Sequence, residues 1–403
     1  MKKFLSLALA LLMVLTCVSV FASCDTEKKD GEVTLTPVAK EELKLGVILL
    51  HDEDSTYDLN FINGINAAKK ALGLEDSQVI MKRNIPESNA CYDAALDLID
   101  EGCDIIFADS FGHETHMLKA AEEHPEVQFC HATGNQAHVK NLANYHNAFA
   151  SIYEGRFLAG VAAGMKLNEM IEAGTITAEK AKMGYVGAFT YAEVISGYTS
   201  FYLGAKSVCP SVTMDVQFTG SWYDETAEKN TAMSLIEGGC VLISQHADSM
   251  GAPSACEEKN VPNVSYNGST KDHCPNTFIV SSRIDWAPYI KYICEQTIKG
   301  EAIATDWCGT ISTGSVVLTD VNTTAAAEGT VAKLEEVKAA LVAGTTHVFD
   351  TANFTVEGKA ITSHKVEEKE VIKDGYFNES DIMSAPYFDL KIDGITLLNT
   401  NFG

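Results

Sequence analysis

The chain has 403 residues, of which 46% are apolar, an ordinary share for a globular protein and ample for two hydrophobic cores. Its formal net charge of −25 at pH 7 argues against nucleic-acid binding, which needs a basic footprint, and against direct binding to an anionic membrane surface. Solubility outside the cell is the simpler reason for such a charge.

The N-terminus has the pattern of a secretory signal, in which Met1-Lys2-Lys3 precede an apolar run over residues 4–20. The run is followed by Phe21-Ala22-Ser23-Cys24, which resembles a bacterial lipobox. Cys24 would then be lipidated and become the first residue of the mature chain. An ordinary signal peptide cut near Ala22 is the alternative.

Residues 25–43 are rich in charge and poor in apolar side chains, so we expect a flexible tether between a lipid anchor and the folded part. No later segment is long and apolar enough to span a bilayer. Together these features predict a protein that is lipid-anchored to the cell membrane at its extracytoplasmic face.

Residues 45–50, Leu-Gly-Val-Ile-Leu-Leu, predict a strand buried on both faces, as in a parallel sheet. An acidic loop over residues 51–58 follows, and apolar residues then recur at helical spacing up to Gly73. A buried strand therefore delivers a polar loop to the start of a helix. Because ligands of open α/β sheets bind at the carboxyl ends of the strands, we expect this loop to form half of a binding site.

Strand and helix patterns alternate through the rest of the chain and restart near Asn147. The first set predicts strands over 78–81, 104–108 and 127–131 and helices over 89–101 and around 117–121. The second predicts strands over 182–187, 212–218, 241–244, 263–266 and 278–281, helices over 152–170, 191–208, 224–237 and 285–299, and a tail with a helix over 334–341 and short strands after 348. Two successive β/α sets indicate an α/β protein with two similar lobes and parallel sheets.

Nine of the eleven cysteines follow Cys24, and none of them forms a C-x-x-C pair. Several lie in apolar runs, such as Cys130, which favours buried free thiols. An odd number cannot all pair internally.

Two aromatic residues, Tyr57 and Trp222, each follow a predicted strand, one in each set, and each is followed closely by an acid, Asp58 or Asp224. A flat ligand held between the two rings would gain stacking from both lobes. The alternative is that both rings are core or lid residues.

Two further polar loops follow predicted strands, Asp109-Ser110-Phe111-Gly112-His113 and Gln245-His246-Ala247-Asp248-Ser249. Ligand groups bind at such strand ends. Asp109 and Asp248 could equally cap helices through their side chains, and the two roles can coexist.

Neither a metal site nor a catalytic nucleophile is indicated by the sequence. His113 and His116, three residues apart, could join His131 around a metal, but solvated histidines on a helix face are the simpler interpretation. No G-x-S-x-G motif occurs, and Val161 stands where a phosphate-binding loop needs lysine. We expect no catalytic residues, no metal and no cofactor.

Several motifs, in this order, give residues 43–319 a resemblance to the basic membrane lipoprotein (BMP) family, the substrate-binding proteins of certain ABC transporters. They are Asp54-Ser55-Thr56-Tyr57 with Gly64, Pro125-Glu126-Val127-Gln128-Phe129, Tyr153-Glu154-Gly155-Arg156-Phe157-Leu158-Ala159-Gly160, Gly220-Ser221-Trp222-Tyr223-Asp224, Gln245-His246-Ala247-Asp248-Ser249 and Asp285-Trp286-Ala287-Pro288-Tyr289.

The resemblance implies a type I periplasmic-binding fold, with two Rossmann-like lobes, hinge strands and a ligand in the cleft. The lobes would comprise 44–147 plus 284–310, and 148–283 plus 311–403 with the C-terminal tail. It also implies a purine nucleoside or base as ligand, stacked between Tyr57 and Trp222, with Asp58, a position where many members have Asn, beside the first ring. The expected polar contacts come from Asp58, Asp109, His246, Asp248 and Asn267.

Three departures from the family pattern bear on the ligand. Nucleoside-binding members hold the sugar with an Asp pair and a Lys, where this chain has Asn267-Gly268-Ser269 and Ile284, and the usual first-lobe Asp is Thr115. Each lost charge-assisted hydrogen bond is worth about 1.5–3 kcal/mol. We therefore expect a ribose to bind less well, and a free base or another flat polar ligand to be favoured.

The sequence thus predicts a lipid-anchored binding protein that closes two lobes over a small flat solute and presents it to ABC permease subunits. The alternatives are a nucleosidase-like enzyme acting in the same cleft and a surface sensor of small solutes that works without a transporter. A turnover assay with nucleosides tests the first alternative, and neighbouring permease and ATPase genes test the second.

Overall fold

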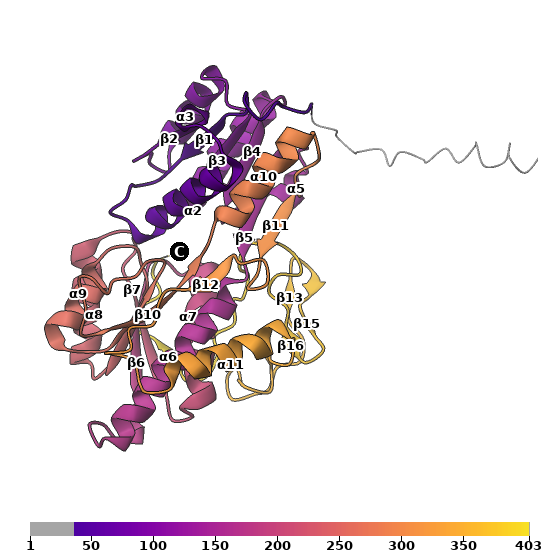
Figure 1. Ribbon diagram of the computed structural model, residues 1–403. Coiled ribbons are helices and arrows are strands. Elements are labelled where there is room, and N and C mark those ends of the chain that lie inside the picture. The colour runs from indigo at the N-terminus through magenta and orange to yellow at the C-terminus, as the bar shows by residue number, and fades with distance from the viewer. Residues whose placement is uncertain (1–35, 403) are drawn as a thin grey trace, which may run out of the picture.

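The computed structural model describes residues 36–402, which form two lobes that are each built on a central sheet (Figure 1). The first sheet has six strands in the order β11-β5-β4-β3-β1-β2, and the second has seven in the order β12-β10-β9-β8-β6-β7-β17. All pairings are parallel except that between β10 and β12. The predicted α/β class with parallel sheets is confirmed.

The first sheet carries helices on both faces. α2 and α10 share one core, in which the Phe61 and Trp286 rings stack with centroids 4.3 Å apart, and α3 and α4 share the other. The elements are β1 (Leu45–Ile48), α2 (Thr56–Leu72), β2 (Val79–Lys82), α3 (Asn89–Asp100), β3 (Ile105–Ala108), α4 (Glu114–Glu123), β4 (Gln128–Ala132), α5 (Ala137–Lys140), β5 (Tyr145–Ala150), α10 (Ala287–Lys299) and β11 (Asp306–Gly309).

The second sheet is covered by α6 and α7 on one face and by α8 and α9 on the other. Gly160 of α6 and Gly204 of α7 let these two helices touch through their backbones, since a Cβ at either position would meet a carbonyl of the other helix. The elements are α6 (Ile152–Glu172), β6 (Lys182–Gly187), α7 (Ala192–Val208), β7 (Thr213–Phe218), α8 (Glu225–Glu237), β8 (Leu242–His246), α9 (Gly251–Lys259), β9 (Asn263–Tyr266), β10 (Phe278–Ile284), β12 (Val316–Leu318), α11 (Thr330–Val342) and β17 (Ile395–Leu397).

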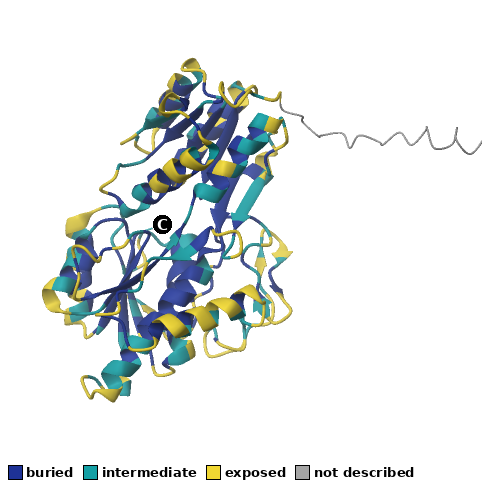
Figure 2. Ribbon diagram, viewed as in Figure 1, coloured by how far each residue is buried: buried dark blue, intermediate teal, exposed yellow. Residues whose placement is uncertain are grey.

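The chain passes between the two sheets three times, after β5, after β10 and after β11. The tail beyond α11 then packs on the second lobe, where Phe349, Phe377 and Phe388 join the core. It forms two small hairpins, β13 (Lys365–Val366) with β14 (Lys369–Glu370) and β15 (Ile372–Lys373) with β16 (Tyr376–Phe377), and ends beside β7 as β17. Figure 2 shows both sheets buried and the outer helix faces exposed.

Most predicted elements are present, and β17 is one of the short strands expected after residue 348, but the strands β5, β11 and β12 were not predicted. β5 has the sequence Tyr-His-Asn-Ala-Phe-Ala and is buried at every position. Its polar residues obscure the apolar pattern by which a buried strand is predicted. β10 also continues to Ile284, so α10 begins at Ala287 rather than at residue 285. The strands β11, β12 and β17 are short, and pairing with distant segments rather than local pattern makes them strands.

The nine cysteines of residues 36–402 are all free, and all but Cys308 are buried, as predicted. Among the helices of this described range, none combines the length and apolar character that crossing a bilayer would need. Cys24, the predicted lipidation site, lies outside the described residues.

Candidate ligand-binding site

A cavity of about 340 Å³ lies between the two lobes. Its wall comes from loops that follow β1, β3 and β4 in the first lobe and β6, β7 and β8 in the second, the carboxyl ends of the parallel strands. The lining residues are Leu50, Tyr57, Ser110, Phe111, Thr133, Glu193, Trp222, His246 and Asp248.

Tyr57 lies in the first turn of α2, where Ser55 caps the helix by accepting a hydrogen bond from the Asp58 N–H at 3.2 Å. The Tyr57 hydroxyl donates to the carbonyl oxygen of Asp109 at 2.6 Å, and its ring meets Phe61 edge-on with centroids 4.8 Å apart. Burial raises the pKa of Tyr57 well above its ordinary value. The ring is therefore a fixed, neutral wall of the cavity.

Trp222 belongs to a group of aromatic rings in the second lobe. Phe189 meets the Trp222 ring edge-on at a centroid distance of 5.0 Å, and it stacks on Tyr191 at 5.1 Å. Tyr191 in turn lies 5.2 Å from Phe111 of the first lobe. The rings thus form a continuous aromatic row from Trp222 across the cleft.

Two buried carboxyl groups, Asp58 and Asp109, lie behind the first-lobe wall. Asp58 accepts from the His51 N–H at 2.7 Å, and Asp109 accepts from the Leu50 N–H at 3.1 Å. Burial raises the pKa of Asp58, but hydrogen bonds from His51 and Ser55 outweigh it and leave that pKa lowered. Burial and the charge of Asp58 raise the pKa of Asp109 well above its ordinary value. The pKa values of the two carboxyls are therefore shifted in opposite directions, which favours a proton on Asp109 rather than on Asp58.

His246 and Asp248 stand at the end of β8 and line the cavity. Burial and the positive charge of Arg156 lower the pKa of His246 to about 4, so the ring is neutral. Its Nε2 lies 3.4 Å from Oε1 of Glu193. Burial and the nearby carboxylates, Glu228 first, raise the pKa of Asp248 well above its ordinary value. The cavity thus offers hydrogen-bond donors and acceptors close together.

Glu228 of α8 holds the two second-lobe loops together. Its Oε1 accepts from the Asp224 N–H at 3.1 Å and from the Ser249 N–H at 3.3 Å. Burial raises the pKa of Glu228 to about 7. Asn267 stands behind Asp248, in the left-handed region with φ 64°, and its Nδ2 donates to Asp248 Oδ1 at 3.5 Å.

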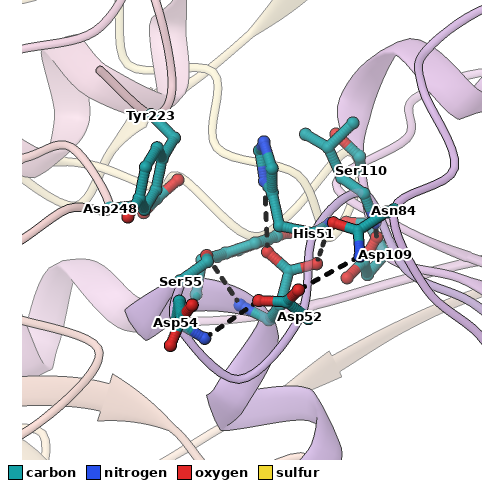
Figure 3. A network of polar contacts seen from close by, with 12 residues as sticks. His51, Asp52, Asp54, Ser55, Asn84, Asp109, Ser110, Tyr223 and Asp248 are labelled. Atoms are coloured by element: carbon teal, nitrogen blue, oxygen red, sulfur yellow. Dashed lines mark hydrogen bonds and ion pairs between the residues drawn. The ribbon is translucent and has the colours of Figure 1, made fainter. Parts of the chain in front are cut away.

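The lobes touch across the cleft. The Thr56 N–H and hydroxyl both donate to the carbonyl oxygen of Asp248, at 3.1 Å each. The His51 ring lies 5.3 Å from that of Tyr223, and Figure 3 shows Tyr223 and Asp248 on one side of the cleft facing His51 on the other. These contacts enclose the cavity.

The structure brings four of the seven predicted ligand-binding residues to the cavity: Tyr57, Trp222, His246 and Asp248. The other three, Asp58, Asp109 and Asn267, are buried but do not line this cavity, and Asn267 instead lines a neighbouring hollow with Arg283 and Asp285. Sequence reasoning did not single out Leu50, Ser110, Phe111, Thr133 or Glu193 as ligand residues. Ser110 and Phe111 lay within a quoted loop, but Glu193 comes from a segment predicted only as helix.

Thr133 carries a backbone signal that the sequence does not reveal. It follows β4 with φ 67°, a conformation that is an outlier for a β-branched residue. Such strain persists where the surrounding structure enforces it, and it clusters at ligand sites. Thr133 is accordingly a residue of the cavity wall.

Two alternatives considered for the polar loops do not hold. Neither Asp109 nor Asp248 caps a helix, because the residues at the cap positions of the following helices are Ser110 and Met250. The prediction of solvated histidines is wrong for His113, which is fully buried with Nε2 2.9 Å from the Ile85 carbonyl oxygen. Among residues 36–402, no three or more His, Cys, Asp or Glu side chains are grouped to hold a metal ion.

Residues 48–344 match the Bmp family model, described as ABC transporter substrate-binding protein PnrA-like. A purine-binding protein of Brucella abortus is 29% identical over 278 residues, which cover 67% of this chain and 73% of that protein. A Haloferax volcanii protein named as a candidate ABC transporter glucose-binding protein is 32% identical over 215 residues, 53% of this chain, so the chain spans only about half (51%) of its length.

Among solved structures, an ABC transporter solute-binding protein from Aeropyrum pernix superposes with a TM-score of 0.63 at 16% identity, over 76% of this chain and 93% of that one. One from Conexibacter woesei gives 0.60 at 18% identity, over 76% and 98%. The expected type I periplasmic-binding fold is thereby confirmed. With a family match over most of its length and the predicted two-lobed architecture, this chain belongs to the Bmp family of ABC transporter substrate-binding proteins.

Proposed function

We propose that this protein is the extracytoplasmic lipoprotein, anchored through Cys24, that binds a purine base or purine nucleoside in the cleft and delivers it to the permease of an ABC importer. The observation that carries the proposal is the cavity itself, which is lined by Tyr57 of the first lobe and by Trp222, Glu193, His246 and Asp248 of the second. The lobes that close over the ligand are those delimited from the sequence, residues 44–147 with 284–310 and 148–283 with 311–403.

The chemistry of the wall suits the edge of a purine. A purine edge alternates N–H donors with ring-nitrogen acceptors. The Glu193 side chain can accept hydrogen bonds, and the burial that raises the pKa of Asp248 favours its protonated form, which can donate one. Aromatic rings on two sides supply the stacking surface for a flat ligand.

The residues at the expected sugar positions favour a free base over a nucleoside. At the positions of the missing sugar contacts, Ile284 is buried and Asn267 is engaged with Asp248. Thr115 is exposed on α4. None of these three residues offers a ribose the charged group that nucleoside-binding members have at that position.

Titration calorimetry on the chain from residue 25 onward tests the proposal, with adenine, guanine, hypoxanthine, their nucleosides, glucose and an amino acid as ligands. We expect a purine base to bind more tightly than its nucleoside and to raise the melting temperature by mass action. Binding of glucose without any purine would overturn the ligand assignment. Release of free base from a nucleoside during the incubation would favour the nucleosidase alternative.

A further inference from the structure

The last described residues of the chain lie against the loops that carry the aromatic wall, although they are outside the family match, which ends at residue 344. After the tail has crossed the second lobe, β17 pairs in parallel with β7 and forms the edge of the second sheet. Figure 1 shows this end of the chain near the boundary between the lobes.

Asn399 binds the point where the Trp222 loop leaves the sheet. The Phe218 N–H donates to Asn399 Oδ1 at 2.8 Å, and Asn399 Nδ2 donates to the Phe218 carbonyl oxygen at 3.0 Å. Phe218 is the last residue of β7, and Trp222 follows four residues later. The side-chain amide therefore continues the β7–β17 ladder to the start of the loop.

Phe402 binds both aromatic loops at once. Its carbonyl oxygen accepts from the Thr190 N–H at 2.7 Å and from the Thr190 hydroxyl at 2.9 Å, and Thr190 lies between Phe189 and Tyr191. Its ring covers Gly220, where φ is 80° and an added Cβ would lie 2.6 Å from the ring. The same residue thus touches the loop of Tyr191 and the loop of Trp222.

We propose that residues 398–402 are a structural part of the ligand site, with Asn399 and Phe402 as positioning residues for the loops of Tyr191 and Trp222. This inference rests on the proposed function only in that the cavity receives the solute. The two loops follow different strands, β6 and β7, and this segment binds both of them. Without it, Phe218 and Thr190 lose these hydrogen bonds and Gly220 loses its cover.

The test compares Asn399→Ala and Phe402→Ala with Asn401→Ala, a matched control because Asn401 is exposed in the same segment. We expect Asn399→Ala to weaken binding of the tightest purine about tenfold, the loss typical of an unsatisfied hydrogen-bonding group. Phe402→Ala keeps the backbone carbonyl that accepts from Thr190 and removes only the ring over Gly220, and we expect it to weaken binding by a smaller but measurable factor. Asn401→Ala should bind as the unaltered protein does. Equal affinities for all four proteins would overturn the inference.

A second control separates positioning from general destabilisation. Leu341→Ala opens a cavity in the core of the second lobe, away from both loops, and should lower the melting temperature without changing affinity at a temperature where it is folded. Weakening of binding by Leu341→Ala to the same degree would contradict a positioning role for Asn399.

The emission of Trp222 gives a readout that needs no ligand, with Trp222→Phe variants identifying its contribution. In ligand-free Asn399→Ala and Phe402→Ala we expect a red-shifted Trp222 emission that is more easily quenched by acrylamide. This measurement does not depend on the identity of the solute, so it applies equally if the ligand is a sugar rather than a purine. A wrong ligand assignment would leave the expected change in Trp222 emission in place, whereas a wrong positioning role for Asn399 and Phe402 would abolish it. Unchanged emission in both variants would overturn the inference.

Discussion

In the first lobe, the wall of the cavity comes from loops after β1, β3 and β4, and one of the hydrogen bonds behind it joins the Leu50 N–H to Asp109, 59 positions away. In the second lobe, the wall comes from loops after β6, β7 and β8, and it is supported by two side chains that do not line the cavity. Glu228 holds the loops of Asp224 and Ser249, and Asn399 holds the end of β7 from 181 positions away.

The two walls should differ in their sensitivity to substitution. The first-lobe wall is held by hydrogen bonds from backbone N–H groups of its own loops to Asp58 and Asp109, whereas the second-lobe wall depends on two braces, Glu228 and Asn399, which do not line the cavity. We therefore expect the second lobe to lose affinity through residues outside the cavity, and the first lobe to respond mainly through the charge state of its buried acids.

The largest effect should come from the ring that the braces hold. Trp222→Ala removes the second-lobe end of the aromatic row, and we expect affinity for the ligand to fall by about 2 kcal/mol or more, roughly 30-fold. Trp307→Ala is the matched control, because Trp307 packs on Tyr289 and Tyr292 in the first lobe. If calorimetry showed the same loss of affinity in Trp222→Ala and in Trp307→Ala, the stacking role of Trp222 would be contradicted.

Removal of the buried brace should come next. Glu228→Ala leaves the N–H groups of Asp224 and Ser249 without their acceptor, and we expect a loss of about 2 kcal/mol in the free energy of unfolding together with weaker binding. Glu228→Gln keeps one acceptor oxygen. Because burial raises the pKa of Glu228 to about 7, the site accommodates a neutral side chain, and we expect this variant to lose less stability than Glu228→Ala. Urea unfolding measures the free energy of unfolding of both variants. Equal losses for Glu228→Ala and Glu228→Gln would refute the role of Glu228 as the acceptor that supports the two loops.

In the first lobe, a charge-state change should raise stability. Because the folded pKa of Asp109 is raised, its contribution is fully present below the unfolded value near 3.8 and is lost as the pH rises toward the folded pKa. Asp109→Asn keeps an acceptor for the Leu50 N–H and needs no proton, so we expect about 1 kcal/mol more stability at pH 7 and little difference at pH 4.

Thermal unfolding at the two pH values measures the effect of Asp109→Asn, with Asp272→Asn as the control because Asp272 is exposed. A lower melting temperature of Asp109→Asn at pH 7 would show that the Asp109 carboxylate is ionised in the folded protein.

The smallest effect should come from the surface of α8. Lys229 lies next to Glu228 in the sequence, but it pairs with Glu258 of α9 at 3.0 Å, and both side chains are about half exposed. We expect Lys229→Ala to change the free energy of unfolding by less than about 0.5 kcal/mol. A larger loss of unfolding free energy in the same urea experiment would mean that the contribution of α8 does not come mainly from the buried hydrogen bonds of Glu228.

The comparison also separates what could be predicted from what could not. The strand at 45–48, its acidic loop and α2 follow from local pattern, since an unbroken apolar run and a helical period are written in neighbouring residues. The placement of Tyr57 and Trp222 at a cavity follows from one topological rule about strand ends. Glu193 and Thr133 had no such signal, because the crossing of loops from different strands decides which residues face the cavity.

Periodicity and strand order are local or follow general rules, and from them the α/β class, the two parallel sheets and several of the loops that line the cavity could be predicted. Only the tertiary structure decided that Asp58 and Asp109 lie behind the wall, that His113 is buried and that Asn399 and Phe402 reach the aromatic loops. The physical reason is that the burial and the protonation of a side chain depend on which distant segments pack against it. The pattern within one segment does not identify those segments.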